Sequence, residues 1–229
     1  MKPYTRYALY FAPEPGPLAE FAAHWLGWDA ASGTPREHPH VDGLPAPISD
    51  LTITPRKYGF HGTLKPPFRL ARGTDRAGLE AAVADLASRL PATTLEGLSV
   101  TPLGRFLALT PDGDASGLAQ IANACVRDLD AFRAPASEAE LERRRASGLT
   151  PRQDSNLLAW GYPYVFEDFR FHMTLTGKIP KAQVAPTAEA LTSAFTPLLS
   201  RPFPITSICL FGERQDGLFE IVHRYALTG

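Results

Sequence analysis

Two stretches of the chain alternate large apolar and polar residues with a period of two, as in a β-strand with one buried face. Residues 169–176 read Phe-Arg-Phe-His-Met-Thr-Leu-Thr, and residues 58–65 read Tyr-Gly-Phe-His-Gly-Thr-Leu-Lys. Because successive side chains of a strand point to opposite faces, each stretch is predicted to place its histidine and its threonine together on the polar face. The two His-x-Thr-Leu motifs lie about half the chain length apart.

The remaining pattern predicts helices and strands whose order repeats. Apolar residues at helical spacing predict helices over residues 17–28, 75–90, 114–132 and 181–199. Ser137 and Glu140 form a capping-box pattern that predicts a helix over residues 137–148, and Thr150-Pro151 predicts the start of another. Strand-like runs between turn residues predict strands over residues 4–12, 93–101, 104–110, 203–211 and 217–227. In both halves the motif strand is followed by a helix and then by two strands with a glycine between them, which indicates an internal repeat.

Residues 29–56 interrupt this order. They are rich in proline and glycine and show little periodicity, which is unusual for a connection inside a compact domain. We therefore expect a surface insertion or lid within a single two-lobed domain that covers residues 1–229.

A pair of histidines on equivalent strands is suited to proton transfer. If a pseudo-twofold axis brings the motif strands together, His61 and His172 flank a common cleft. Thr63 and Thr174 can then donate hydrogen bonds to a phosphoryl group between the two rings. One imidazole would take a proton from water or a ribose hydroxyl, and the other, as imidazolium, would protonate the leaving oxygen. The sequence does not indicate which histidine is the base.

Four further residues are candidates for contact with the substrate. Lys65 falls on the same predicted face as Thr63, where its charge would offset a phosphate; the alternative is a solvent-facing lysine at the strand end. Arg170, two residues before His172, and Tyr58, just ahead of the first motif, have the same two interpretations. Arg6 and its neighbour in the first strand face opposite sides, so only one of them can reach a cleft, and Arg6 is the candidate.

Composition limits the expected partners. The formal charge is -1 and the sequence pI is near 6.6, so the basic excess that binds long nucleic acid is missing. Cys125 and Cys209 lie far apart without a C-x-x-C pair, which indicates buried free thiols.

Residues 38–42 hold two histidines and an aspartate but no further ligands at metal-binding spacing. No apolar run is long enough to cross a membrane. We expect a cytoplasmic protein with no membrane partner, metal or cofactor.

The runs around these residues resemble a known family. The sequences H-G-T-L at 61–64 and H-M-T-L at 172–175 resemble the paired H-x-[T/S] signatures of the 2H phosphoesterase superfamily. Residues 6–11, 58–68 and 160–177 are similar to its DUF1045 branch, whose members are named phosphonate-metabolism proteins. The resemblance implies an α+β fold with two pseudo-twofold-related lobes of antiparallel sheet, flanked by helices, around a central cleft. It also implies that the two histidines are catalytic, that the two motif threonines bind phosphate, and that no metal is needed.

For function, the resemblance implies opening of a small cyclic phosphodiester, such as a ribosyl cyclic phosphate from phosphonate breakdown. One alternative keeps the site but acts on an RNA end as a 2′,3′-cyclic phosphodiesterase or ligase-like enzyme. Another is a sensor that binds a nucleotide or phosphate without catalysis, and a structural interaction protein is a further alternative. The identity of the substrate, the oligomeric state and the role of residues 29–56 remain open.

Overall fold

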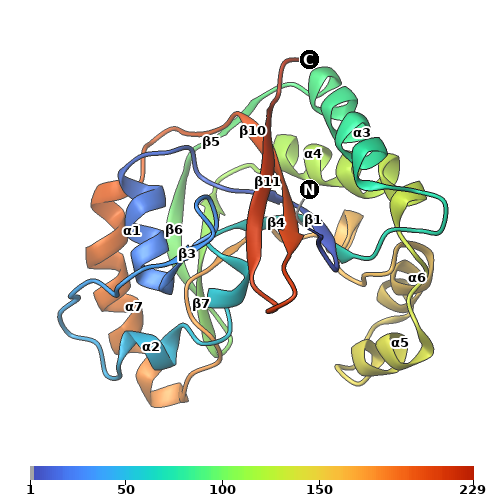
Figure 1. Cartoon of the computed structure of the whole chain (residues 1–229). Helices are drawn as coiled ribbons and strands as arrows, with labels where there is room; N and C mark the ends of the chain where they lie inside the picture. The colour runs from blue at the N-terminus through green and yellow to red at the C-terminus, as the bar shows by residue number, and fades with distance from the viewer. Residues whose placement is uncertain (1–2) are drawn as a thin grey trace.

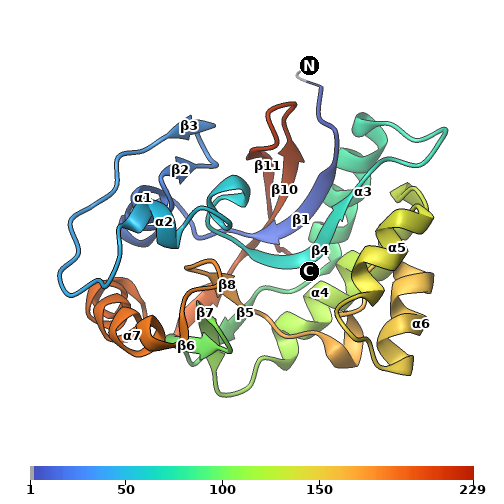
Figure 2. The same ribbon diagram turned by 90° about the horizontal axis from the view of Figure 1, so that it is seen from below.

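The computed structural model describes residues 3–229. Seven strands of this described part form one sheet in the order β11-β10-β1-β4-β8-β7-β6, and every neighbouring pair is antiparallel (Figures 1 and 2). The strands are β1 (Tyr7–Phe11), β4 (Gly62–Phe68), β6 (Gly97–Leu103), β7 (Phe106–Asp112), β8 (Met173–Thr174), β10 (Ser207–Glu213) and β11 (Phe219–Ala226). Two small ladders join β2 (Trp28–Asp29) to β3 (Thr34–Pro35) and β5 (Thr93–Leu95) to β9 (Phe203–Ile205).

The helices follow the predicted periodicity closely. They are α1 (Pro17–Leu26), α2 (Ile48–Leu51), α3 (Arg76–Arg89), α4 (Ser116–Asp128), α5 (Glu138–Arg145), α6 (Pro151–Trp160) and α7 (Lys181–Phe195). The capping box predicted at Ser137 and Glu140 is present at the start of α5. Its side-chain oxygens accept hydrogen bonds from free backbone N–H groups, which fixes where the helix begins. No helix in residues 3–229 is long and apolar enough to cross a membrane.

The predicted internal repeat is present in the order of elements. The first half runs β4-α3-β5-β6-β7 and the second runs β8-α7-β9-β10-β11. The halves are interlocked, because α3 packs on the β10–β11 hairpin and α7 packs on the β6–β7 hairpin. In Figure 1, α7 lies beside β6 and β7, while α3 lies at the other end of the sheet near β11. Strand β1 inserts between β4 and β10 and breaks the symmetry.

The two faces of the sheet are packed differently. In β1, Leu9 and Phe11 point into the large core that the helices cover, whereas Ala8 and Tyr10 belong to a smaller cluster on the other face. The indole of Trp28 joins that smaller cluster and donates a hydrogen bond to the carbonyl of Phe219 at 2.7 Å. This second face, with few helices over it, is the one that carries the polar side of the motif strands.

Lys65 does not lie on that polar face, so its predicted placement is wrong in both interpretations. Tyr10 pairs with Thr63, but Leu9 pairs with Lys65, so β4 has one extra residue between these pairs. Such a bulge moves the following side chain to the other face of the sheet. Lys65 is only 1% exposed, and its Nζ donates to the carbonyl of Val126 at 2.9 Å and to Asp130 Oδ1 at 3.2 Å.

The boundaries of the motif strands also differ from the prediction. The first motif strand continues past residue 65, where the alternating stretch ends, because the prolines at residues 66 and 67 lie inside β4. The second strand shrinks to Met173–Thr174: Met173 pairs with both β4 and β7, and Thr174 pairs with β7. The alternation of burial nevertheless continues from residue 170 to 175. Thr176 departs from it: the side chain is buried, accepts a hydrogen bond from the N–H of Leu107 and donates one to a carbonyl.

Residues 29–56 form a mostly exposed stretch that contains β3 and the short α2. Arg56 ties the end of this stretch to the helical layer, because its guanidinium donates to the carbonyl of Leu26 at 2.9 Å and to Thr52 Oγ1 at 3.0 Å. Both free cysteines are buried, as the sequence predicts.

The position of Lys65 predicts a structural role. Val126 is one of the last residues of α4, where carbonyl groups lack partners within the helix, and the lysine supplies a donor. We expect Lys65→Met, which keeps most of the apolar stem, to lower the free energy of unfolding by about 1–3 kcal/mol. Urea unfolding measures this change. If Lys65 bound phosphate instead, the substitution would leave stability unchanged and weaken ligand binding. That result would contradict the structural assignment.

Gly62 is predicted to be required for the packing of the two motif strands. A Cβ on this residue would overlap the ring of Phe171, the neighbour of His172. We expect Gly62→Ala to destabilise the fold by about 1–3 kcal/mol, the usual cost of overpacking, and Phe171→Leu to restore part of the loss. Thermal unfolding is the measurement, with Gly16→Ala as control because a Cβ there meets nothing closer than 3.9 Å. Equal stability of the two single variants would refute the steric argument.

Candidate functional site

The two motifs meet at the centre of the sheet, where β4 and β8 are neighbours. Gly62 pairs with Met173 across an antiparallel ladder. Extending this register by one residue in each direction places His61 opposite Thr174 and Thr63 opposite His172. Directly opposite residues share a face, and diagonal neighbours lie about 7–8 Å apart. The histidines and threonines therefore alternate at the corners of a square, with each histidine diagonal to the other.

The two imidazole rings are held in equivalent ways. The Nδ1 of His61 lies 2.9 Å from the carbonyl oxygen of Gly59, and the Nδ1 of His172 lies 2.9 Å from the carbonyl oxygen of Arg170. A carbonyl can only accept, so each Nδ1 carries a proton and donates it. This fixes the tautomer and leaves both Nε2 atoms for proton transfer. In each half the acceptor is the residue two positions earlier, which is a consequence of the repeat.

His61 is enclosed by aromatic rings. Its ring stacks on Tyr10 with centroids 3.8 Å apart, and Tyr58 lies at 5.9 Å. The pKa of His61 is lowered to about 4, chiefly by burial and to a smaller extent by the electrostatic influence of His172, while the hydrogen bond to Gly59 opposes the change. The electrostatic effect of one histidine on the other is consistent with their diagonal placement. At neutral pH the His61 ring is uncharged.

On the other side of the square, Thr63 and His172 line a cavity of about 170 Å³. The wall of this cavity includes Tyr162, Tyr164 and Phe169, so an aromatic surface lies beside the two polar side chains. Thr63 also contacts His61, because its Oγ1 lies 3.3 Å from Nε2 of that ring. The hydroxyl thus connects the His61 side of the site to the cavity on the His172 side.

The other residues that were predicted to contact the substrate differ in where they lie. Tyr58 lies beside His61, as described above. Arg170 lines the cavity, but its guanidinium donates to the carbonyls of Glu167 and Phe169 at 3.0 and 2.6 Å. Arg6 lies on the site face of the sheet and is paired through two nitrogens with Glu213 at 2.6 Å. Lys65 is excluded from the site by the bulge in β4.

Two further tyrosines belong to the site, and one of them, Tyr10, was not predicted from the sequence. Burial raises the pKa of Tyr10 and of Tyr162, so both hydroxyls stay protonated and can donate a hydrogen bond. The pKa of Tyr10 also responds to Tyr58, Arg6 and Tyr162, which places these side chains around its hydroxyl. The available signal was the strand period: Tyr10 is four residues from Arg6 and shares its face.

Metal ligation has no support among the described residues. Within residues 3–229, no group of three or more His, Cys, Asp or Glu side chains is placed to hold a metal ion. His40, in the segment with two histidines, instead has its Nε2 2.9 Å from Asp42 Oδ1, and both side chains are largely exposed.

Comparison with known proteins relates the chain to two named relatives. It is 42% identical over 180 residues to a protein of Janthinobacterium sp. (strain Marseille) named ribose 1,5-bisphosphate phosphokinase PhnN, covering 78% of this chain and 40% of that protein. A protein of the same name from Laribacter hongkongensis (strain HLHK9) is 34% identical over 215 residues, covering 93% and 49%. The chain thus spans less than half the length of these curated relatives.

Among solved structures, E. coli LigT in its apo form is similar with a TM-score of 0.45 and 16% identity, with 100% of both chains covered. A likeness this distant does not bear on activity. The model of the DUF1045 family, described as a protein of unknown function, matches residues 63–220, which include Thr63, His172 and Thr174. Because this match spans most of the sequence, the chain belongs to the DUF1045 family.

Proposed function

We propose that the chain is a metal-independent phosphoesterase of the 2H type, which opens a small cyclic phosphodiester by acid/base catalysis. The observation that supports this most directly is the crosswise arrangement of two histidines and two threonines at the β4–β8 pair. In-line displacement at phosphorus needs a base on the side of attack and an acid on the opposite side. Imidazoles about 7–8 Å apart leave room for a phosphoryl group between them.

The reaction is proposed to proceed as follows. A water molecule attacks phosphorus while Nε2 of one histidine takes its proton, so a new P–O bond forms. The P–O bond to one ring oxygen breaks, and Nε2 of the other histidine gives a proton to that oxygen. The product is a phosphomonoester next to a free hydroxyl. Thr63 and Thr174 donate hydrogen bonds to the nonbridging oxygens, whose charge grows in the transition state.

We assign the base to His61 and the acid to His172. The low pKa of His61 keeps its ring neutral and ready to accept a proton, and its Nδ1–H is already committed to Gly59. His172 keeps more contact with solvent and lies beside the cavity, where it can exchange protons between turnovers. The neutral hydroxyls of Tyr10 and Tyr162 are further donors close to the proposed substrate.

A phosphorylated sugar is the substrate class that we favour. The curated relatives are named for a kinase that acts on a ribose bisphosphate, so a ribosyl cyclic phosphate is the first compound to test. The aromatic wall formed by Tyr162 and Tyr164 is also compatible with a base or a sugar face.

Removal of either histidine is predicted to abolish most of the activity. We expect His61→Ala and His172→Ala each to lower kcat by about 10²–10⁴-fold, the usual contribution of one positioned acid or base. Turnover is measured with EDTA present on 2′,3′-cyclic nucleotides and on 5-phosphoribosyl 1,2-cyclic phosphate.

His40→Ala is the matched control, because this histidine is exposed and far along the chain from both motifs. Loss of activity in only one motif variant would refute the two-histidine mechanism. Measurable binding without turnover of any cyclic ester by the wild type would favour a sensor instead.

The pKa of His61 predicts an unusual pH dependence. Since the neutral ring is the base, the decrease of kcat/KM of the free enzyme on the acidic side should occur as pH drops through about 4 rather than near 6.5. The unfolded chain takes up this proton near pH 6.5 and the folded chain does not, so stability is also expected to decrease as pH falls from 6.5 to 4. NMR titration of the histidine rings measures the pKa directly. A His61 that titrates near 6.5 would contradict both expectations.

A further inference from the structure

A second pocket, distinct from the cavity beside His172, is lined by arginines. Among the described residues it contains Arg6, Arg69, Arg133 and Arg144, together with the carboxylate of Glu140, and its volume is about 40 Å³. A single water needs roughly 10–15 Å³ on this measure, so the pocket has room for a group of a few heavy atoms. Its size suits a phosphate group but not a nucleoside.

The charges of this arginine pocket are only partly balanced. Arg6 pairs with Glu213, Arg69 with Glu140 at 3.1 Å, and Arg133 with Asp130 at 2.7 Å. Within the described part of the chain, Arg144 forms no ion pair with a carboxylate. Its guanidinium lies over the ring of Tyr162, 4.9 Å from the centroid. The pocket therefore keeps one positive group that is held in place by an aromatic ring and remains able to bind an anion.

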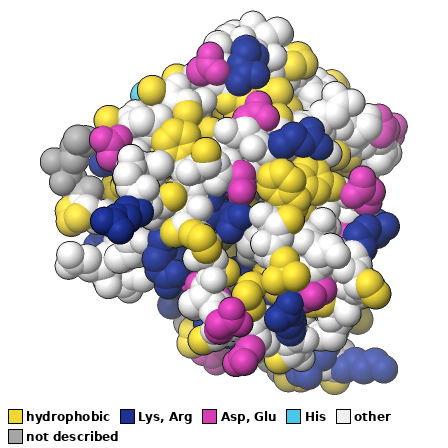
Figure 3. Space-filling model, turned by 90° about the vertical axis from the view of Figure 1, so that its right-hand side faces the viewer, with side chains coloured by type: hydrophobic (Ala, Val, Ile, Leu, Met, Phe, Trp, Pro, Cys, Tyr) yellow, Lys and Arg dark blue, Asp and Glu magenta, His cyan; other side chains and the backbone are white. Residues whose placement is uncertain are grey.

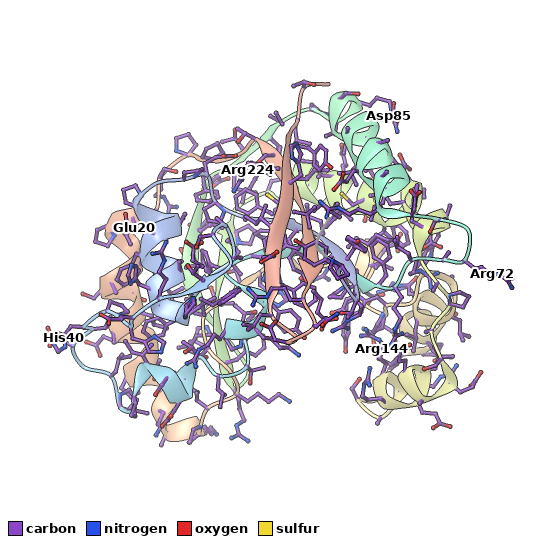
Figure 4. All side chains as sticks on the ribbon, viewed as in Figure 1. Glu20, His40, Arg72, Asp85, Arg144 and Arg224 are labelled. Atoms are coloured by element: carbon purple, nitrogen blue, oxygen red, sulfur yellow. The ribbon has the colours of Figure 1, made fainter. Side chains whose placement is uncertain are left out.

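The arginine pocket and the site cavity are lined by residues that are adjacent in sequence. Pro66 and Tyr162 line the cavity that contains His172, while the next residue along β4, Pro67, and the residue before Tyr162, Gly161, line the arginine pocket. Consecutive Cα atoms are 3.8 Å apart, and the guanidinium of Arg144, which lines the arginine pocket, lies over the ring of Tyr162, which lines the site cavity. The two pockets are therefore neighbours. Arg144 lies between α5 and the sheet, unlike Arg72, which projects from the edge of the molecule (Figure 4).

We infer that the arginine pocket binds a second, non-reacting phosphate of the substrate. The substrate class is then a small molecule that carries both a cyclic phosphodiester and a terminal phosphomonoester. This inference rests on the proposed function for the reacting end. Arginine is suited to the task because its planar fork binds two phosphate oxygens at once. Elsewhere on this side of the molecule, Lys and Arg side chains are interspersed with Asp and Glu (Figure 3), so the surface charge as a whole does not select a dianion.

The first test compares substrates that differ only in the terminal phosphate. Ribose 1,2-cyclic phosphate is assayed with and without a 5-phosphate, and adenosine 2′,3′-cyclic phosphate with and without a 5′-phosphate. We expect kcat/KM of the wild type to be at least about tenfold higher for the phosphorylated member of a pair, the effect of roughly one charge-assisted contact. Equal values within both pairs would overturn the inference while leaving the two-histidine mechanism intact.

The second test removes the unpaired arginine. Arg144→Gln should raise KM for the phosphorylated substrate about tenfold or more and leave the unphosphorylated partner unchanged, because only one of them reaches the pocket. Arg143→Gln is the matched control, since that neighbour on α5 is exposed and does not line the pocket. An equal loss on both substrates would indicate a structural role for Arg144 and contradict the inference. Thermal unfolding of both variants checks that α5 is intact.

A binding measurement separates this inference from the proposed reaction. Ribose 5-phosphate is titrated into His172→Ala protein by calorimetry, with and without Arg144→Gln. If ribose 5-phosphate binds to His172→Ala protein and this binding is lost when Arg144→Gln is added, the result supports the arginine pocket as a phosphate site. This holds even if no cyclic ester is turned over. Absence of binding in the His172→Ala background, together with turnover by the wild type that ignores the terminal phosphate, would reject the pocket and keep the reaction.

Discussion

The single contact between β4 and β8 is the constraint on which the site depends. These strands pair at only one position, Gly62 with Met173, yet this pair sets which residues stand opposite each other on the polar face. The contact is close because residue 62 lacks a side chain, and the ring of Phe171 occupies the space that a Cβ would fill. The same ring precedes His172 in sequence. The close approach of the β4 and β8 backbones and the placement of His172 therefore depend on the same packing contact.

The interlocked halves explain how so short a pairing is kept in register. Each half contributes a helix to one end of the sheet and a hairpin to the other end. As a result, α3 covers β10–β11 and α7 covers β6–β7. The small ladder between β5 and β9 joins the halves again away from the site. One core cluster contains residues of β4, β8, α3 and α7, so separating β4 from β8 would disturb this buried core as well as the few residues of the site.

The sequence was sufficient for the elements and the motifs but not for every side chain. Period-two alternation and the repeat identified His61, Thr63, His172 and Thr174, and the structure brings them together on one face. Lys65 was misplaced because one bulged residue in β4 reverses the alternation, and a bulge without a glycine signal leaves no mark in a hydrophobic pattern. Tyr10 was missed since its role arises from a ring on a neighbouring strand. Contacts between distant elements are not encoded in local spacing.

The environment of His61 also explains why the proposed reaction would depend on an anionic substrate. With a pKa of about 4, His61 is a weak base, because burial and the electrostatic influence of His172 both disfavour its imidazolium form. A phosphate bound between the rings places negative charge next to both histidines and opposes the repulsion between them. In the proposed reaction, proton transfer to His61 then becomes easier only when the substrate is present. The proposed base stays neutral near pH 7 without a ligand, and a bound phosphate would supply the charge that favours its protonation.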